Sequence, residues 1–209
     1  MLCPRQAPLE HVLLENVSWD YYEQTLHELD ETHIHATYDQ GRMEIMTLGD
    51  RHEIAKKNIA RLLEIYAYEK RIPLTGAGSV TCRRKDLKRG VEPDECYYVH
   101  TPPPAGTDIQ LNLSVYGPPD LVIEVDVTSL SIPRRPIYAA LGVAELWHFD
   151  GEHLTSLHLQ ADSTYKPAER SVAFPELPME QMLRFLRLAY EESQDAAVRA
   201  LGEWIRAGS

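Results

Sequence analysis

Cysteine is scarce in this chain. Three cysteines occur in 209 residues, at Cys3, Cys82 and Cys96. They form no Cys-X-X-Cys pair and no even set that could close a disulfide framework. This scarcity excludes a small disulfide-stabilised scaffold, and we expect free thiols in a cytoplasmic protein.

Long apolar runs are missing as well. No run approaches the roughly 20 residues of a membrane-spanning helix. The first residues, MLCPRQAPLEH, lack the basic start and the apolar centre of a signal peptide. The hydrophobic share of 44% and the charged share of 25% are instead typical of a soluble globular protein, so we expect no membrane partner.

Positive charge is in short supply. The chain has 21 Lys and Arg residues against 32 Asp and Glu residues, a formal net charge of −11. This balance argues against indiscriminate binding to nucleic acid. It remains compatible with an enzyme that has a local basic patch and a metal ion that offsets acidic ligands.

Internal repeats, low-complexity tracts and clear boundaries are also absent, so we expect residues 1–209 to form a single domain. Within it, residues 38–151 would form the core and residues 152–209 the C-terminal strands and helices. Period, capping and turn signals predict the remaining elements. Residues 1–16 and 101–117 are expected to be irregular. Helices are expected at Trp19–Leu29 (capped by Ser18), Asp50–Lys70, Pro178–Glu192 and Gln194–Arg206. Strands are expected at His33–Tyr38, Arg42–Met46, Gly76–Arg84, Glu92–His100, Leu154–Leu159 and Ser171–Phe174.

The stretch from Pro118 to Gly151 is the most informative part of the chain. Asp120 to Asp126 alternates polar and apolar residues with period two, so it predicts a strand on which Glu124 and Asp126 share a face. Prolines bracket the start of a helix that runs to Leu141. Gly142 follows as its cap, and Val143 to Phe149 predicts a second, parallel strand.

The helix predicted over residues 50–70 carries an apolar stripe at three- and four-residue steps. Asp50 and Glu53 predict a capping box at its start. His52 lies at the head of the stripe, so it is expected to face the sheet. A histidine satisfied at a helix N-terminus and a histidine in a functional site both fit this position.

Two strands begin with a proline–aspartate pair, Pro93-Asp94 and Pro119-Asp120. If these strands pair, Asp94 and Glu124 converge at one edge of the sheet. Carboxylates from neighbouring strands suit Mg²⁺ or Mn²⁺, which can activate water and neutralise phosphate charge. The alternative is that these are solvated charges, or charges paired with the basic loop.

Four segments in order, QGRMEIMTLGDRHE, GSVTCRRKDLKRGVEPDECYYV, PPDLVIEVD and YAALGVAELWHFDG, resemble the Uma-two-like restriction endonuclease family. The resemblance runs from about Tyr38 to Gly151. It implies a place in the PD-(D/E)XK nuclease superfamily. The implied fold class is α/β, a mixed sheet with the core order helix, three strands, helix, strand.

The resemblance also implies site residues. Asp94 and Glu124 match the acidic metal ligands, and the backbone carbonyl of Val125 would be a third ligand. Glu44 and His52 match polar positions that precede the nuclease core, although Glu44 could simply pair with Arg42.

This chain departs from the superfamily pattern at one position. Two residues after Glu124 the pattern has lysine, and this chain has Asp126, which could orient water. In the family the basic group migrates to the following helix, where Arg134 or Arg135 would contact the scissile phosphate. Arginine stays protonated and is therefore a poor proton shuttle.

A basic cluster stands out against the acidic background. We predict that its side chains contact a DNA backbone, although the cluster could also be only a solvated loop. The cluster consists of Arg83, Arg84, Lys85, Lys88 and Arg89.

Together these features predict a Mg²⁺-dependent endonuclease that cleaves DNA. We also expect a homodimer, since a twofold dimer is the commonest assembly. The rival prediction, favoured by the missing lysine, is a nuclease-fold protein that binds nucleic acid or a protein partner without cutting. His148, His153 and His158 lack metal-ligand spacing, so we predict no zinc site.

Overall fold

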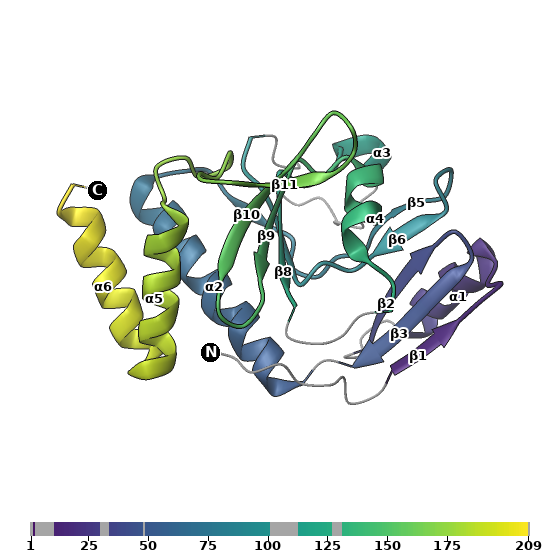
Figure 1. The fold of residues 1–209 in the computed structure, drawn as a ribbon, viewed down its shortest axis with the longest axis horizontal. Helices are drawn as coiled ribbons and strands as arrows, with labels where there is room; N and C mark the ends of the chain where they lie inside the picture. The colour runs from purple at the N-terminus through teal and green to yellow at the C-terminus, as the bar shows by residue number, and fades with distance from the viewer. Residues whose placement is uncertain are drawn as a thin grey trace.

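The computed structural model describes residues 2, 11–29, 34–47, 49–100, 113–126 and 131–208. In this part of the chain, two sheets and the helices that cover them are arranged in layers (Figure 1). The first sheet has the order β1-β3-β2-β6-β5 and the second the order β11-β10-β9-β8-β7-β4. The strands are β1 (His11–Leu14), β2 (Ile34–Asp39), β3 (Arg42–Thr47), β4 (Thr75–Gly76), β5 (Cys82–Arg84), β6 (Arg89–Val91), β7 (Glu95–Tyr98), β8 (Leu121–Val125), β9 (Glu145–Phe149), β10 (Leu154–Leu159) and β11 (Tyr165–Ala168).

The six-stranded sheet is mixed. Strands β8 and β9 run parallel, because the crossover helix α4 (Arg134–Leu141) connects them, and the other pairs are antiparallel. Gly142 ends α4 in the left-handed conformation, with φ +84°, as the sequence predicts. The predicted α/β class, with a mixed sheet and helices on its faces, is confirmed.

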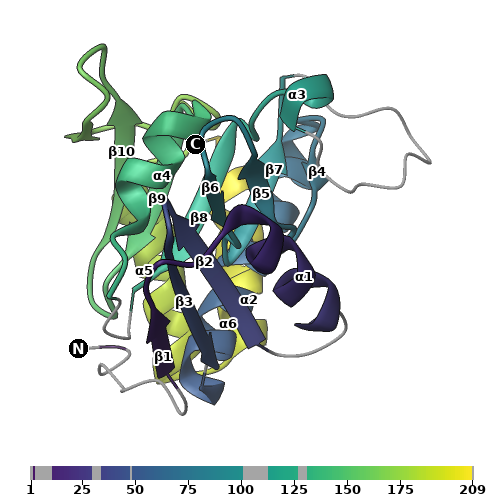
Figure 2. The ribbon, with the colours of Figure 1, turned by 90° about the vertical axis from the view of Figure 1, so that its right-hand side faces the viewer.

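Helices cover both faces of this sheet (Figures 1 and 2). On one face, α2 (Asp50–Lys70) packs on β7, β8 and β9, and α5 (Met179–Glu191) and α6 (Gln194–Arg206) pack against α2 in turn. On the other face lies α4. The apolar stripe predicted for residues 50–70 is buried there. The remaining helices are α1 (Trp19–Leu29) and α3 (Leu113–Tyr116).

The five-stranded sheet has its own small core under α1, built around Trp19, Tyr22, Ala36, Tyr38 and Met43. The β2–β3 hairpin turns at Gln40 and Gly41, both with positive φ, which is the conformation that this tight turn requires. The predicted hairpin and the Ser18 cap of α1 are confirmed, since Tyr21 N donates to Ser18 Oγ.

Several local predictions are wrong. Residues 11–14, expected to be irregular, form β1, because β3 offers them an edge. The strand expected over Gly76–Arg84 is broken at Gly78, which has φ +61°, and its two halves join different sheets.

The basic segment, expected to be a loop, is a hairpin of β5 and β6. Ser171–Phe174 is not a strand, because the N–H groups of Val172 and Ala173 donate to the buried Glu145 carboxylate instead of to a strand partner. The strand that pairs with β10 is β11.

The capping box predicted at the start of α2 does not form. Gly49 occupies the N-cap position and no side chain bonds there. Glu53 instead contacts His52 and Lys56.

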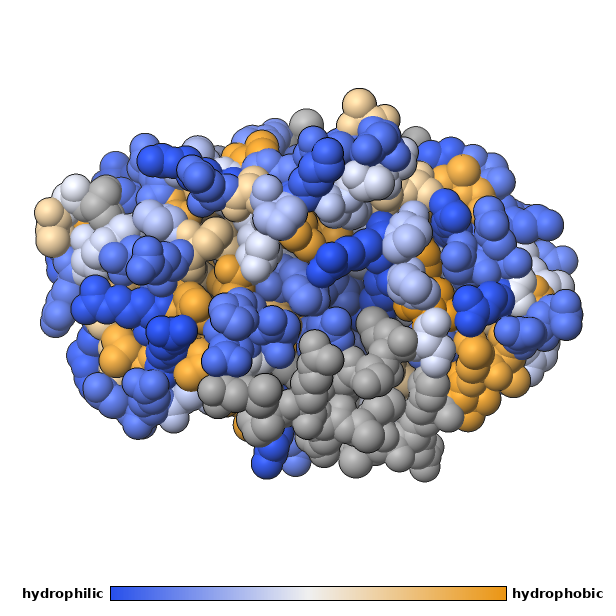
Figure 3. Space-filling view, viewed as in Figure 1, coloured by the Kyte–Doolittle hydropathy of each residue, from blue (hydrophilic) through white to orange (hydrophobic). Residues whose placement is uncertain are grey.

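Most of the segment expected to be irregular, residues 101–117, lies outside the described residues. The described end of that segment contains the short helix α3. In the described part of the chain no helix has the length and apolar character needed to cross a membrane. The view in Figure 3 shows a largely hydrophilic face on which apolar side chains gather only in small groups.

Candidate active site

Asp94 and Glu124 meet because β7 and β8 are neighbours. These strands pair antiparallel, with Glu95 opposite Ile123, so Asp94 lies immediately before β7 and beside the end of β8. Its Oδ2 accepts a hydrogen bond of 2.6 Å from the backbone N–H of Val125. Both acidic residues are buried, with exposed fractions of 1% for Asp94 and 8% for Glu124.

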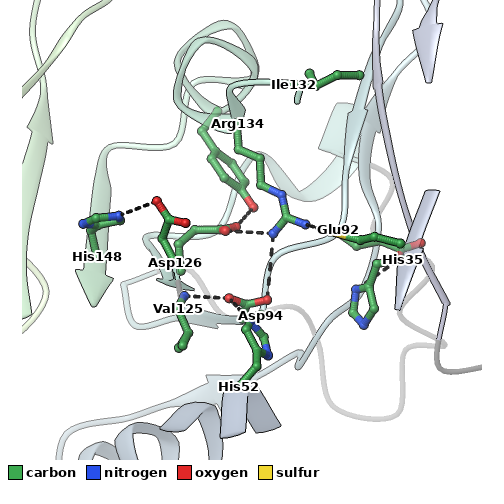
Figure 4. A network of polar contacts seen from close by, with 12 residues as sticks. His35, His52, Glu92, Asp94, Val125, Asp126, Ile132, Arg134 and His148 are labelled. Atoms are coloured by element: carbon green, nitrogen blue, oxygen red, sulfur yellow. Dashed lines mark hydrogen bonds and ion pairs between the residues drawn. The ribbon is translucent and has the colours of Figure 1, made fainter. Parts of the chain in front are cut away.

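Arg134, in the first turn of α4, lies against both carboxylates (Figure 4). Its Nη1 is 2.8 Å from Glu124 Oε2 and 3.8 Å from Asp94 Oδ1. Its Nη2 is 3.7 Å from the sulfur of Met46, on the hairpin of the other sheet. The side chain is 6% exposed, so this guanidinium is a buried countercharge for two acids.

Tyr138 lies one helical turn after Arg134 and therefore on the same face of α4. Its hydroxyl donates to Glu124 Oε1, so the two oxygens of this carboxylate have separate partners. Tyr138 is not among the site residues that the sequence predicts. The spacing of four residues from Arg134 is the signal that could have found it.

The charges of the cluster shift its pKa values. Burial raises the pKa of Glu124 above its ordinary value, against the lowering effect of the Arg134 charge. Burial also acts to raise the pKa of Asp94, but the charges of His52 and Arg134 outweigh it and lower the value to about 2. We therefore treat Asp94 as an anion at neutral pH.

His52 reaches Asp94 from the first turn of α2. Its Nε2 is 3.1 Å from Asp94 Oδ2, and its side chain is 3% exposed. Burial opposes the charged form, but the Asp94 carboxylate and a contact with Glu53 raise the pKa of His52 to about 9. The predicted orientation of His52 towards the sheet is confirmed, because its ring contacts Asp94 at the start of β7.

One oxygen of the cluster is left without a hydrogen bond. Asp94 Oδ1 is fully buried and, among the described residues, has no hydrogen-bond donor. The Arg134 guanidinium, 3.8 Å away, provides a charge contact only. The carbonyl of Val125 points to the same strand edge as its N–H, as in any extended residue, and hence towards Asp94.

Two carboxylates and one carbonyl suit Mg²⁺, which keeps several waters and binds through one or two carboxylates. Within the described ranges, no three His, Cys, Asp or Glu side chains gather closely enough to hold a metal by themselves. The residues present therefore fit a partly hydrated magnesium-type ion and do not fit a closed zinc-type site.

Asp126 follows β8 and contacts His148 on β9. Asp126 Oδ2 is 3.4 Å from His148 Nε2. In Figure 4 Asp126 lies between His148 and Arg134. Where the superfamily pattern has lysine, this chain has Asp126, and the Asp126 carboxylate contacts His148 on the neighbouring strand.

The other predicted site residues lie elsewhere. The two oxygens of Glu44 accept the backbone N–H groups of Ser131 and Ile132, 2.6 and 3.1 Å away, just before α4. Arg135 is exposed at the start of α4.

The basic residues lie on the β5–β6 hairpin. Four of them contact carboxylates: Arg83 with Glu23, Arg84 with Asp86, Lys85 with Asp20 and Arg89 with Asp39. The fifth, Lys88, is exposed.

Sequence reasoning missed the pair formed by His35 and Glu92. His35 Nδ1 is 3.3 Å from Glu92 Oε2, and both side chains are largely buried beside the cluster. Burial lowers the pKa of His35 to about 4 and raises the pKa of Glu92 to about 7. The pair connects β2 to the segment before Asp94, a long-range contact for which the sequence contains no local signal.

Comparison with known proteins identifies the family of the chain. The family model "Uma2: Putative restriction endonuclease" matches residues 19–191, which is most of the chain. The chain belongs to the Uma2 family. No curated protein matches it.

One similar solved structure is a "putative nuclease belonging to DUF820" from Anabaena variabilis ATCC 29413. It has a TM-score of 0.53 and 15% sequence identity, and the match covers 81% of this chain and 99% of that one. At this identity the likeness shows only that the two proteins share a fold. The family match supports a nuclease-like function and a nucleic-acid substrate.

Proposed function

We propose that this Uma2 protein is a Mg²⁺- or Mn²⁺-dependent endonuclease that hydrolyses DNA phosphodiester bonds. The observation that carries the proposal is the buried Asp94 Oδ1, which has no hydrogen-bond donor among the described residues and lies beside Glu124 and the Val125 carbonyl edge. Asp94, Glu124 and the Val125 carbonyl would hold the ion. A bound divalent ion would lower the pKa of a coordinated water and offset phosphate charge.

The chain's own residues have separate roles in this proposal. His52 keeps Asp94 ionised and fixed, because the His52 cation lies 3.1 Å from it. Arg134 supplies a planar guanidinium suited to a phosphate oxygen. Arg135, exposed on the same helix, is a further phosphate contact.

The β5–β6 hairpin remains a proposed DNA contact. Because four of its five cations already contact carboxylates, only part of its charge is available to a phosphate backbone. We expect a modest dependence of DNA affinity on salt, in keeping with the net charge of −11. A cytoplasmic location and a homodimer are also part of the proposal.

The test is nicking of supercoiled plasmid in Mg²⁺ or Mn²⁺. We expect cleavage by the natural chain and its loss in Asp94→Asn, which keeps the size of the side chain but removes its charge. Circular dichroism and thermal unfolding identify a variant that has lost its fold. If the chain binds plasmid without nicking it in either metal, the non-cutting alternative replaces this proposal.

A further inference from the structure

The Asp126–His148 pair has a place in the fold that the proposed function does not yet use. The two side chains approach within 3.4 Å, and they are 36% and 21% exposed. His148 Nδ1 makes no hydrogen bond or ion pair with any described residue. One nitrogen of this partly exposed ring is thus held by a carboxylate, and the other has no partner among the described residues.

The register of the sheet places this pair beside the metal ligands. Strands β8 and β9 run parallel with Glu124 directly opposite His148, so the two side chains leave the same face of the sheet. Neighbouring strands are about 4.8 Å apart. Asp126 follows Glu124 by two residues, one strand repeat, and so lies on the same face of the sheet. Its contact with His148 is drawn in Figure 4.

A hydrolytic site requires a group that can accept a proton from the attacking water. The superfamily lysine is replaced here by Asp126, and Arg134 cannot serve, because a guanidinium stays protonated. Imidazole is the side chain most often used for this task near neutral pH. A carboxylate on one ring nitrogen selects the tautomer and leaves the other nitrogen to act as base.

We propose that His148, held by Asp126, is the proton acceptor of this active site and takes the place of the missing lysine. The inference rests on the proposed nuclease function. The water oxygen forms a bond to phosphorus and gives its proton to His148. The phosphorus bond to one sugar oxygen breaks, and that oxygen takes a proton from solvent. Asp126 acts through His148 and is a positioning residue.

The chain supplies a matched control. His153 forms the same kind of pair with Asp150, at 3.3 Å, but this pair is on the surface and the histidine is 66% exposed. His148 and His153 therefore share their chemistry and differ in their distance from Asp94 and Glu124. A role that depends on position must separate the two histidines.

The experiment measures plasmid nicking with Mn²⁺ for His148→Ala, His153→Ala and Asp94→Asn, with and without added imidazole. We expect His148→Ala to lose on the order of 10²-fold or more in kcat, with part of the loss restored by imidazole, while His153→Ala is unchanged. Asp126→Asn is expected to lower kcat without raising KM for DNA, and Asp126→Glu to recover part of the loss.

Other outcomes overturn the inference in distinguishable ways. If Asp94→Asn is inactive but His148→Ala cleaves within threefold of the natural chain, the inference fails and the proposed nuclease stands. A loss in His148→Ala that appears in KM, or that imidazole does not restore, makes His148 a binding or structural residue. If the natural chain does not nick, or Asp94→Asn nicks equally well, the proposed function fails and this inference fails with it.

Discussion

Arg134 is the residue on which the buried charges of the site depend. Asp94 and Glu124 are both nearly inaccessible to water, and this guanidinium is the cation that lies against both. Two carboxylates in so small a volume repel each other unless a cation lies between them. The arginine that sequence reasoning assigned to phosphate contact therefore also has a stabilising role.

Replacing Arg134 by Met, which preserves most of the volume without the charge, should cost about 3–5 kcal/mol in the free energy of unfolding. The reason is that Asp94 and Glu124 would remain buried without their cation. Arg135→Met, on the exposed neighbour, is the control and should change stability by less than about 0.5 kcal/mol. Urea titrations at pH 7 measure both. Equal losses in the two variants would show that Arg134 does not compensate these carboxylates.

His35 should make stability depend on pH. Burial, with Arg134 and Lys56 adding to it, lowers its pKa from 6.5 to about 4. A histidine that is neutral in the folded state stabilises fully above pH 6.5, and this contribution is lost as the pH falls towards 4.

Between pH 7 and pH 5 the natural chain should therefore lose about 2 kcal/mol more stability than His35→Gln. Urea unfolding of both proteins at the two pH values gives this difference directly. Parallel changes in the two proteins would mean that His35 titrates normally in the folded state.

At the scale of elements, the site depends on contacts between the two sheets. Glu44 extends from β3 of the five-stranded sheet and accepts two backbone N–H groups that precede α4 of the six-stranded sheet. This contact fixes the start of the helix that carries Arg134 and Tyr138. Met46, on the same strand, contacts the Arg134 guanidinium.

Glu44→Gln should cost about 1–3 kcal/mol in unfolding free energy, because an amide nitrogen would face a backbone N–H that a carboxylate oxygen now accepts. Glu15→Gln is a suitable control, because Glu15 is 65% exposed and its contact with Arg42, at 3.7 Å, is long. The control should change stability by less than about 0.5 kcal/mol. If Glu44→Gln is as stable as the control, α4 is positioned by its apolar face alone.

Local signals were sufficient for the elements that carry the site. The alternation in residues 120–126 and the proline and glycine signals around residues 133–142 placed Glu124 and Arg134 correctly, because each depends on neighbours in sequence. The position of β1, the break at Gly78 and the loop at Ser171–Phe174 depend on a strand edge, a change of sheet and the Glu145 carboxylate. The Asp126–His148 contact was missed for the same reason, since it follows from the register of β8 and β9.

At the scale of the whole molecule, the C-terminal helices share the main core. Leu186 and Leu201 are buried against α2, and Leu183, Val198, Trp204 and Ile205 pack partly on the same core. Unpacked apolar residues on these helices would be a reason to expect a dimer contact here. Their packing within the chain removes that reason, and the homodimer remains a prediction without an assigned surface.

We predict that residues 1–209 unfold as one domain. Helix α2 contacts α5, α6 and β8 of the six-stranded sheet. Helix α4, which follows β8, contacts β5 and β6 of the five-stranded sheet, so the two sheets share packing contacts. Calorimetry should show a single transition with equal calorimetric and van't Hoff enthalpies. Two resolved transitions would assign the sheets to separate domains.

The proposed nuclease requires a divalent ion held by Asp94, Glu124 and the Val125 carbonyl. An anomalous difference map from crystals soaked in Mn²⁺ shows whether such an ion binds there. We expect a peak between the Asp94 and Glu124 carboxyls, with metal–oxygen distances of about 2.1 Å. We also expect the peak to disappear in Asp94→Asn. A map without a peak at these carboxyls, with Arg134 Nη1 still against Glu124 at saturating Mn²⁺, would contradict this proposal.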